Sequence, residues 1–189
     1  MTRAINEGVR IDIGELAPLF YAAFEDFLGQ EADNITNGTS EQNLCGRLAM
    51  LLDRQRQEVG LVGYFVDTEY NRNGGKVKTI IGEVAQTITI RCDIIVHSRG
   101  TIFAQDNLLV VEMKRSNHTA SEKNKDRVRL RAMTKQTYDD VWSADRKTFP
   151  EHVCGYVVGY YLELNRRARR FLVEEYAGGQ QTGSAEVTF

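Results

Sequence analysis

Two acidic side chains and one amine stand in apolar stretches of the chain, where they are suited to chemistry. Glu112 and Lys114 end the run "NLLVVEMKRS", and Asp93 lies in the preceding apolar stretch, "IRCDIIV". In an extended strand the side chains alternate between faces, so Glu112 and Lys114 point the same way. If the two stretches form neighbouring strands, we expect Asp93 to lie beside Glu112.

The types of these residues indicate which chemistry to expect. Neighbouring carboxylates repel each other unless a cation joins them, and their hard oxygen atoms suit Mg²⁺ or Mn²⁺. A nearby lysine supplies a compact positive charge that can hold a phosphate oxygen or orient an attacking water. Metal-assisted hydrolysis of a phosphodiester needs both components. The alternative is that Glu112 and Lys114 form a structural ion pair with each other at a strand end.

The spacing of apolar side chains predicts the elements that position these residues. A helical repeat covers 13–28, "GQEADNITNGTS" breaks it, and a second helix opens at Thr39 or Ser40. A third helix is expected from about Ser121 to 142. Strands are expected in 61–70, 86–98, the run that contains Glu112, 151–164 and 169–177. The alternation within 86–98 puts Cys92 on the face of Ile94 and Val96, and Asp93 on the other.

The order of these elements predicts the fold class. Three strands in succession favour hairpins, whereas strand, helix, strand favours a crossover. We therefore expect an α/β (α+β) fold with a mixed central sheet of about five strands flanked by helices. The 189 residues fit a single domain. Its expected parts are an N-terminal helical extension over 1–38, a core over 40–164 and a flexible tail over 177–189.

The bulk composition narrows the classes of function. A net charge of −2 gives no overall attraction to a polyanion, so any nucleic-acid binding must come from local clusters of Lys and Arg. Three widely spaced cysteines and a polar N-terminus favour reduced thiols and a cytoplasmic protein. The best apolar run, "VCGYVVGYYLEL", is far shorter than the ~20 residues that span a bilayer, so no membrane partner is expected. Neither a phosphate-cradling glycine motif nor zinc-ligand spacing is present.

The acidic and basic pattern resembles the signature of the PD-(D/E)XK nuclease superfamily, which includes restriction endonucleases and Holliday-junction resolvases. "CD" at Cys92 and Asp93 stands before "EMK" at 112–114 on the next predicted strand. The predicted elements between Ser40 and Leu164 also follow the family's order of helix, three strands, helix and strand. The family's motif proline is replaced here by Cys92. The resemblance implies a restriction-endonuclease-like core.

The resemblance also implies roles for individual residues. Asp93, Glu112 and the carbonyl of Met113 would bind Mg²⁺ or Mn²⁺. Lys114 would position the hydrolytic water or stabilise the transition state. Glu41, on the helix before the first strand, would be an outer ligand or water anchor. Glu41 can equally be a solvated first-turn carboxylate that the helix dipole favours.

The activity that the resemblance implies is metal-dependent hydrolysis of nucleic acid, with DNA as the expected substrate. A homodimer is compatible with it, because cutting both strands of a duplex commonly uses two sites. A different class of function is a non-catalytic nucleic-acid-binding or assembly module on a nuclease scaffold. Such a module would act as a subunit of a defence or repair complex.

Two basic clusters are candidate contacts to nucleic acid. A four-residue repeat places a basic stripe along the third predicted helix, formed by Lys123, Arg127, Arg131 and Lys135. The second cluster, "NRRARR", carries Arg166 and Arg167 at a predicted turn. Both clusters can follow a phosphate backbone beside the site. The alternative for the stripe is a solvated helix face.

Overall fold

The computed structural model describes residues 10–70, 72–73, 76–77, 79–81, 87–89, 92–136 and 154–189. Its helices are α1 (Ile13–Asn37), α2 (Glu41–Glu58) and α3 (Ala120–Thr134), with a short 3-10 helix, η1 (Phe103–Gln105). The main sheet contains β1 (Phe65–Thr68), β6 (Ile94–His97), β7 (Asn107–Arg115), β8 (Val158–Asn165), β9 (Arg170–Ala177) and β10 (Gln180–Thr188). Two hairpins are formed by β2 (Arg72–Asn73) with β3 (Lys76–Val77) and by β4 (Thr79–Ile81) with β5 (Thr87–Thr89).

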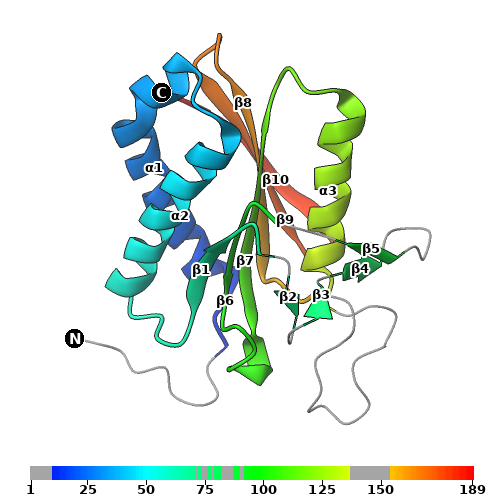
Figure 1. Ribbon diagram of the computed structural model, residues 1–189. Coiled ribbons are helices and arrows are strands. Elements are labelled where there is room, and N and C mark those ends of the chain that lie inside the picture. Colours follow the sequence, from blue (N-terminus) through cyan, green and yellow to red (C-terminus); the bar gives the residue numbers. More distant parts are fainter. Residues whose placement is uncertain are drawn as a thin grey trace.

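The six strands of the main sheet lie in the order β1-β6-β7-β8-β9-β10 (Figure 1). β1, β6 and β7 are antiparallel neighbours, and so are β8, β9 and β10. β8 is parallel to β7, because the chain crosses over through α3 between them. The predicted mixed α/β class is therefore confirmed, including the crossover that follows the strand of Glu112.

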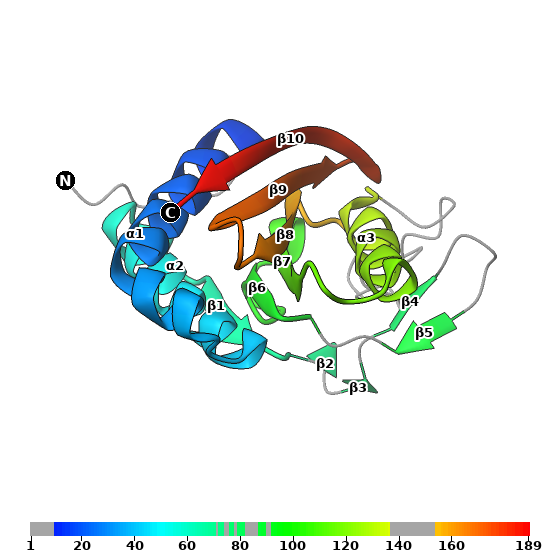
Figure 2. The ribbon, with the colours of Figure 1, turned by 90° about the horizontal axis from the view of Figure 1, so that it is seen from above.

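Helices cover both faces of the sheet, α1 and α2 on one side and α3 on the other (Figure 2). The alternation of β7 serves both faces. Leu109 and Val111 pack into the core beneath α1 and α2, whereas Val110 packs with Leu130 of α3. Phe20 of α1 stacks on Tyr160 of β8, with 3.7 Å between ring centroids. The central strands of the sheet are thus buried between the helices on both faces.

No helix among the described residues has the length and apolar character to cross a membrane.

α1 runs nine residues beyond the helix predicted over 13–28, through most of the polar stretch that was expected to break it. Glu31 and Ile35 of this extension are buried. Arg47 of α2 pairs with Glu31 at 2.5 Å, so the acid is neutralised by a residue of the next helix. The helix ends at Gly38, whose φ of 87° suits glycine. The turn-like composition concealed a helix with one buried face.

The strand predicted over 86–98 is interrupted before its second half. β6 comprises only Ile94–His97, and the chain bends at Asp93. Cys92 lies on the α3 side of the sheet, where its Sγ is 3.6 Å from the Sδ of Met133, whereas Ile94 belongs to the opposite core. The predicted placement of Cys92 on the face of Ile94 is therefore wrong. The bend breaks the period-two pattern at the acid itself.

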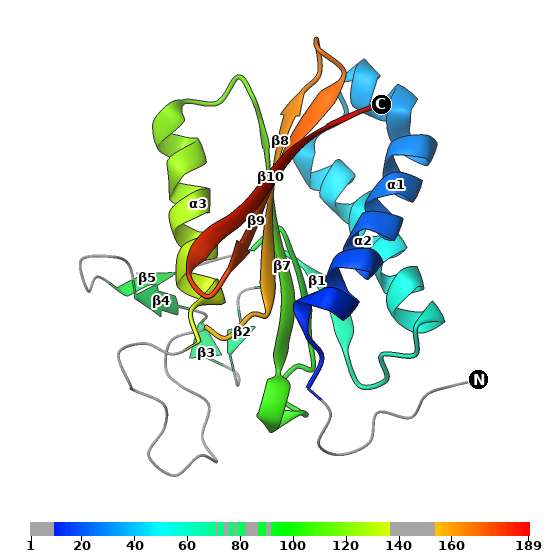
Figure 3. The same ribbon diagram turned by 180° about the vertical axis from the view of Figure 1, so that it is seen from behind.

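The stretch expected to be a flexible tail forms the last strand of the sheet, β10, which lies in front of the other strands in Figure 3. Gly178 and Gly179 have φ values of 58° and 82° and connect β9 to β10 as a two-residue hairpin turn. Phe189 packs against Phe171, with 5.7 Å between ring centroids. β10 is largely exposed, so it carries little apolar pattern, and its main chain pairs with β9.

α3 is fixed at both ends. At its start Thr119 and Glu122 form a capping box. At its end the buried hydroxyl of Thr134 accepts a hydrogen bond from the N–H of Gly179, 3.2 Å away in the β9–β10 turn. The helix ends at Thr134, before the predicted limit, and 137–153, which include the start of the strand predicted over 151–164, lie outside the described residues.

Replacing Phe20 by alanine is expected to lower the free energy of unfolding by about 3–5 kcal/mol, because it removes a fully buried ring and leaves a cavity against Tyr160. Met50→Ala, at a side chain that is 63% exposed, serves as the control and is expected to change it by less than about 0.5 kcal/mol. Chemical denaturation of the two variants checks this. Equal effects would contradict the packing of α1 on β8.

Candidate active site

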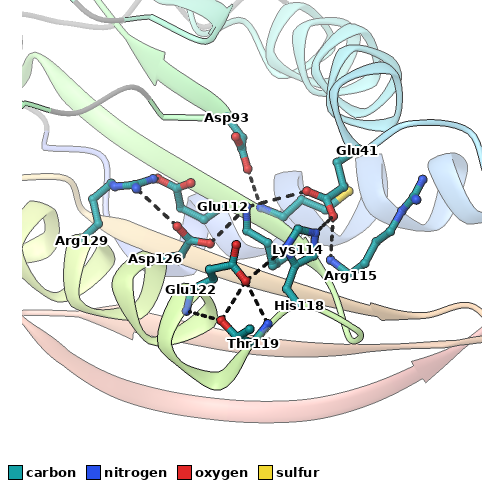
Figure 4. A network of polar contacts seen from close by, with 11 residues as sticks. Glu41, Asp93, Glu112, Lys114, Arg115, His118, Thr119, Glu122, Asp126 and Arg129 are labelled. Carbon is teal, nitrogen blue, oxygen red and sulfur yellow. Dashed lines mark hydrogen bonds and ion pairs between the residues drawn. The ribbon is translucent and has the colours of Figure 1, made fainter.

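The predicted acids and lysine meet where β7 ends, beside the start of α2 (Figure 4). Ile94 pairs with Val111 in the β6–β7 register, so Asp93 stands opposite Glu112. The Oδ2 of Asp93 accepts a hydrogen bond of 2.8 Å from the backbone N–H of Met113. The structure thus brings Asp93 and Glu112 side by side, as the hairpin connection predicted.

Two residues of α3, Asp126 and Arg129, complete the cluster. Arg129 Nη1 donates to Glu112 Oε1 at 2.7 Å, and Arg129 Nη2 lies 3.3 Å from Asp126 Oδ1. The amine of Lys114 lies 3.5 Å from Asp126 Oδ2 and 3.7 Å from Glu41 Oε2. Glu112 and Lys114 therefore pair with other partners, and the expected alternative of a mutual ion pair is wrong.

Glu41, the first residue of α2, faces inward toward the end of β7. Its Oε1 accepts a 3.0 Å hydrogen bond from the N–H of Arg115 and lies 3.0 Å from Nε2 of His118. The Arg115 guanidinium donates to the carbonyls of Gly38 and Thr39, just before α2. Glu41 is therefore fixed against β7, and it is not the solvated carboxylate of the alternative interpretation.

The electrostatics of the cluster are those of crowded, buried acids. Burial raises the pKa of Glu112 well above its usual value, and the negative charge of Asp93 raises it further. Burial also raises the pKa of Asp93. Burial opposes the charge of Lys114, but four acids, Asp126, Glu41, Asp93 and Glu112, together more than offset this effect, so the pKa of Lys114 is raised. Lys114 is thus a cation at neutral pH.

The donor atoms of this cluster suit a hard divalent cation. Asp93 and Glu112 present adjacent carboxylates whose repulsion a cation would relieve. The N–H and the C=O of a strand residue point toward the same neighbouring strand, so the carbonyl of Met113 faces the side of Asp93. The Oδ2 of Asp126 is buried without a hydrogen-bond partner. Oxygen donors of these types are the ligands of Mg²⁺ and Mn²⁺.

The cluster is not a preformed metal cage. Among the described residues, no three His, Cys, Asp or Glu side chains are arranged to hold a metal ion together. The ion pairs of the cluster form one chain instead, in which Lys114 pairs with Glu41 and Asp126, and Arg129 pairs with Asp126 and Glu112 (Figure 4). The carboxylates fit a cation in type and proximity, but they hold side-chain cations in this arrangement.

Two of the four residues in the basic stripe of α3 are paired with acids of the sheet. The amine of Lys123 lies 3.0 Å from Glu163, and Arg127 donates to Glu174 at 2.8 Å. The Arg131 guanidinium lies over the ring of Tyr176, and the Lys135 side chain lies beside Gly179. The acidic partners come from β8 and β9, which are distant in sequence. Lys123 and Arg127 therefore form ion pairs across α3 and the sheet, and a phosphate backbone would have to compete with their acidic partners.

The second basic cluster has a different environment. Arg166 and Arg167 are exposed in the turn between β8 and β9. Leu164, just before this turn, pairs with Arg115, one residue beyond Lys114. The Arg166 guanidinium lies against Gly38, at the junction of α1 and α2. This cluster therefore lies on the same edge of the molecule as the acids.

Asp126 and Arg129 were not predicted from the sequence, although a signal for one of them was present. Asp126 precedes Leu130 and Met133 by four and seven residues, so it occupies the apolar stripe of the helix. An acid in such a position is buried and needs a partner. No comparable signal marks Arg129, because its partner Glu112 lies on another element.

Comparisons of the chain with protein-family models, with curated proteins and with solved structures found no significant match.

The raised pKa of Glu112 predicts a pH dependence of the metal-free protein. The native state holds this proton to higher pH than the unfolded chain does. Stability therefore falls as the pH rises from the ordinary value of 4.5 through the native pKa. Glu112→Gln lacks this titration. As the pH rises, the free energy of unfolding of the wild type should therefore fall relative to that of the variant. Denaturation across pH 4–8 in the presence of a chelator checks this prediction, which a pH-independent gap would contradict.

Proposed function

We propose that this protein is a divalent-metal-dependent nuclease that hydrolyses phosphodiester bonds in DNA. The observation that carries the proposal is the placement of Asp93 and Glu112 side by side, with the Lys114 amine on the same strand as Glu112. A helix, an antiparallel three-strand meander, a crossover helix and a parallel strand surround them in the order of the PD-(D/E)XK nucleases. The proposal is therefore supported both by the short signature of Asp93, Glu112 and Lys114 and by the order of the helices and strands around it.

Asp93, Glu112 and the carbonyl of Met113 would hold Mg²⁺ or Mn²⁺ at this site. Such an ion supplies a bound water of lowered pKa and polarises the phosphate. The protein contributes the rigid frame, because Glu112 and Met113 belong to the central strand β7, and Asp93 is tied to Met113 by a hydrogen bond. A frame of this kind keeps the carboxylates in place without further ordering.

Lys114 carries the positive charge of the mechanism. Since its pKa is raised, it is protonated at neutral pH and cannot take a proton from water as a general base. Its amine can instead donate hydrogen bonds to a phosphoryl oxygen and offset the charge that develops in the transition state. Glu41 and Asp126 hold this amine between α2 and α3, so they act on the reaction by positioning Lys114.

Arg166 and Arg167 are the proposed contacts to the phosphate backbone. Both are exposed, and their turn directly follows the strand that pairs with the end of β7. A chain whose net charge is −2 needs such a local cluster to attract a polyanion. The α3 stripe, whose Lys123 and Arg127 pair with acids of the sheet, is not part of the proposed surface.

Removing the charge of Lys114 tests the proposal most directly. Lys114→Ala is expected to lower the rate of Mg²⁺- or Mn²⁺-dependent DNA cleavage by about 10²–10³-fold, the usual effect of losing one preorganised stabilising group. Lys125→Ala, which removes an exposed lysine of α3, is the matched control and should cut at the wild-type rate. Duplex, branched and single-stranded DNA, with RNA in parallel, serve as substrates.

Two outcomes would reject the catalytic proposal. One is that no nucleic acid is cut with either metal, and the other is that Lys114→Ala cuts as well as the wild type. Binding of DNA without any turnover would favour the alternative, a binding or assembly module within a larger complex. The complete set of two acids and a lysine argues against that alternative, because a site without turnover is free to lose one of them.

The double variant Arg166→Ala, Arg167→Ala is expected to bind DNA more weakly than the wild type does, whatever the base sequence of the DNA. It should also reduce the slope of log affinity against log salt concentration by about 1–2, one for each lost phosphate contact. Lys123→Ala, whose amine is paired with Glu163, should leave the slope unchanged. Fluorescence anisotropy over a salt series, with chelator present to prevent cleavage, measures both. If Lys123→Ala changed the slope more than the double variant does, the DNA contact would lie on α3 and not at Arg166 and Arg167.

A further inference from the structure

Arg129 forms ion pairs with two acids of the site at once. Its guanidinium bridges Glu112 and Asp126, whose side chains are only 2% and 7% exposed. Arg129 is the ion-pair partner that the structure gives to Glu112, at 2.7 Å. Asp126 has a second cation, the amine of Lys114. The departure of Arg129 would thus leave Asp126 partly neutralised and Glu112 without its positive partner.

A buried carboxylate that loses its partner is strongly destabilised unless another cation replaces it or it takes up a proton. The same physics works in reverse, because a metal ion bound to Glu112 would lie within a few ångströms of the guanidinium and would be repelled by it. Arg129 and a divalent cation therefore compete for one carboxylate. The Arg129 side chain is 23% exposed, so it has a route toward solvent that Glu112 lacks.

We propose that Arg129 is a built-in counter-cation, which occupies Glu112 while no metal is bound and releases it when the metal enters. The inference rests on the proposed function, since it assumes that Glu112 is a metal ligand. It adds a form of control: the exchange sets the metal concentration at which the site becomes loaded. It also explains how Glu112 and Asp126 lie close together without a metal ion, because the guanidinium of Arg129 pairs with both.

The proposal predicts an effect opposite to that of a purely structural residue. Losing a structural partner of Glu112 would disorder a ligand and weaken metal binding. Losing a competing cation strengthens metal binding. The direction of the change in affinity therefore separates the two roles, without any measurement of catalysis.

The experiment is Mn²⁺ binding by calorimetry, without nucleic acid, to the wild type and to Arg129→Gln. Glutamine keeps a hydrogen-bond donor but carries no charge. We therefore expect the dissociation constant of the variant for Mn²⁺ to be at least about tenfold lower than that of the wild type. Arg127→Gln is the matched control, because it removes the same charge from the same helix but from a pair with Glu174. Its Mn²⁺ affinity should change much less.

Thermal unfolding provides a second readout. Without metal, Arg129→Gln should unfold at a lower temperature than the wild type, because Glu112 has lost its partner. At saturating Mn²⁺ that difference should shrink, because the metal ion replaces the missing charge. If Arg129→Gln does not fold, the guanidinium N–H resonances of the wild type are followed by NMR during Mg²⁺ addition, and those of Arg129 should move to the values of a solvent-exposed arginine.

The outcomes distinguish this inference from the function on which it rests. Equal or weaker Mn²⁺ binding by Arg129→Gln overturns the exchange, as do Arg129 resonances that Mg²⁺ leaves in place. Tighter binding together with a failure to cut any nucleic acid supports the exchange and rejects the nuclease. If neither protein binds Mn²⁺, both proposals are overturned.

Discussion

The arrangement of this protein depends on one electrostatic constraint, the need to balance the charge of acids gathered in a place with little water. Asp93 and Glu112 lie beside each other next to an apolar core, and Asp126 faces them from the opposite element. Each negative charge raises the cost of the next. Lys114 and Arg129 supply the two positive charges that make the cluster tolerable. The cluster therefore takes its counter-charges from the protein's own side chains.

The scaffold brings these charges together by combining two kinds of strand connection. The antiparallel β6–β7 pair places Asp93 opposite Glu112, and the parallel β7–β8 pair requires a crossover, which is α3. The crossover helix then returns over the strand that it has just left, carrying Asp126 and Arg129 to the acids. α2 delivers Glu41 from the other face. One strand, β7, is therefore in contact with every element of the site.

The local parts of this arrangement could be predicted from the sequence, and the distant pairings could not. Alternation and strand order were sufficient to predict that Asp93, Glu112 and Lys114 lie together near the end of β7. The same local period misread the α3 stripe, because Arg127 is fixed by Glu174, a residue of β9 that no spacing rule connects to it. β10 escaped prediction since an exposed edge strand has little apolar pattern, although the two glycines before it are a hairpin signal.

The hydrogen bond from Gly179 to Thr134 has a consequence for the order of events during synthesis. Asp93 and Glu112 leave the ribosome well before β8 and β9 exist to support α3. Until the β9–β10 turn has been made, the helix that carries Arg129 lacks the anchor at its end. A nascent chain therefore contains Asp93 and Glu112 before the anchor of α3 exists. The cluster, held as the structure shows it, requires the chain at least as far as Gly179.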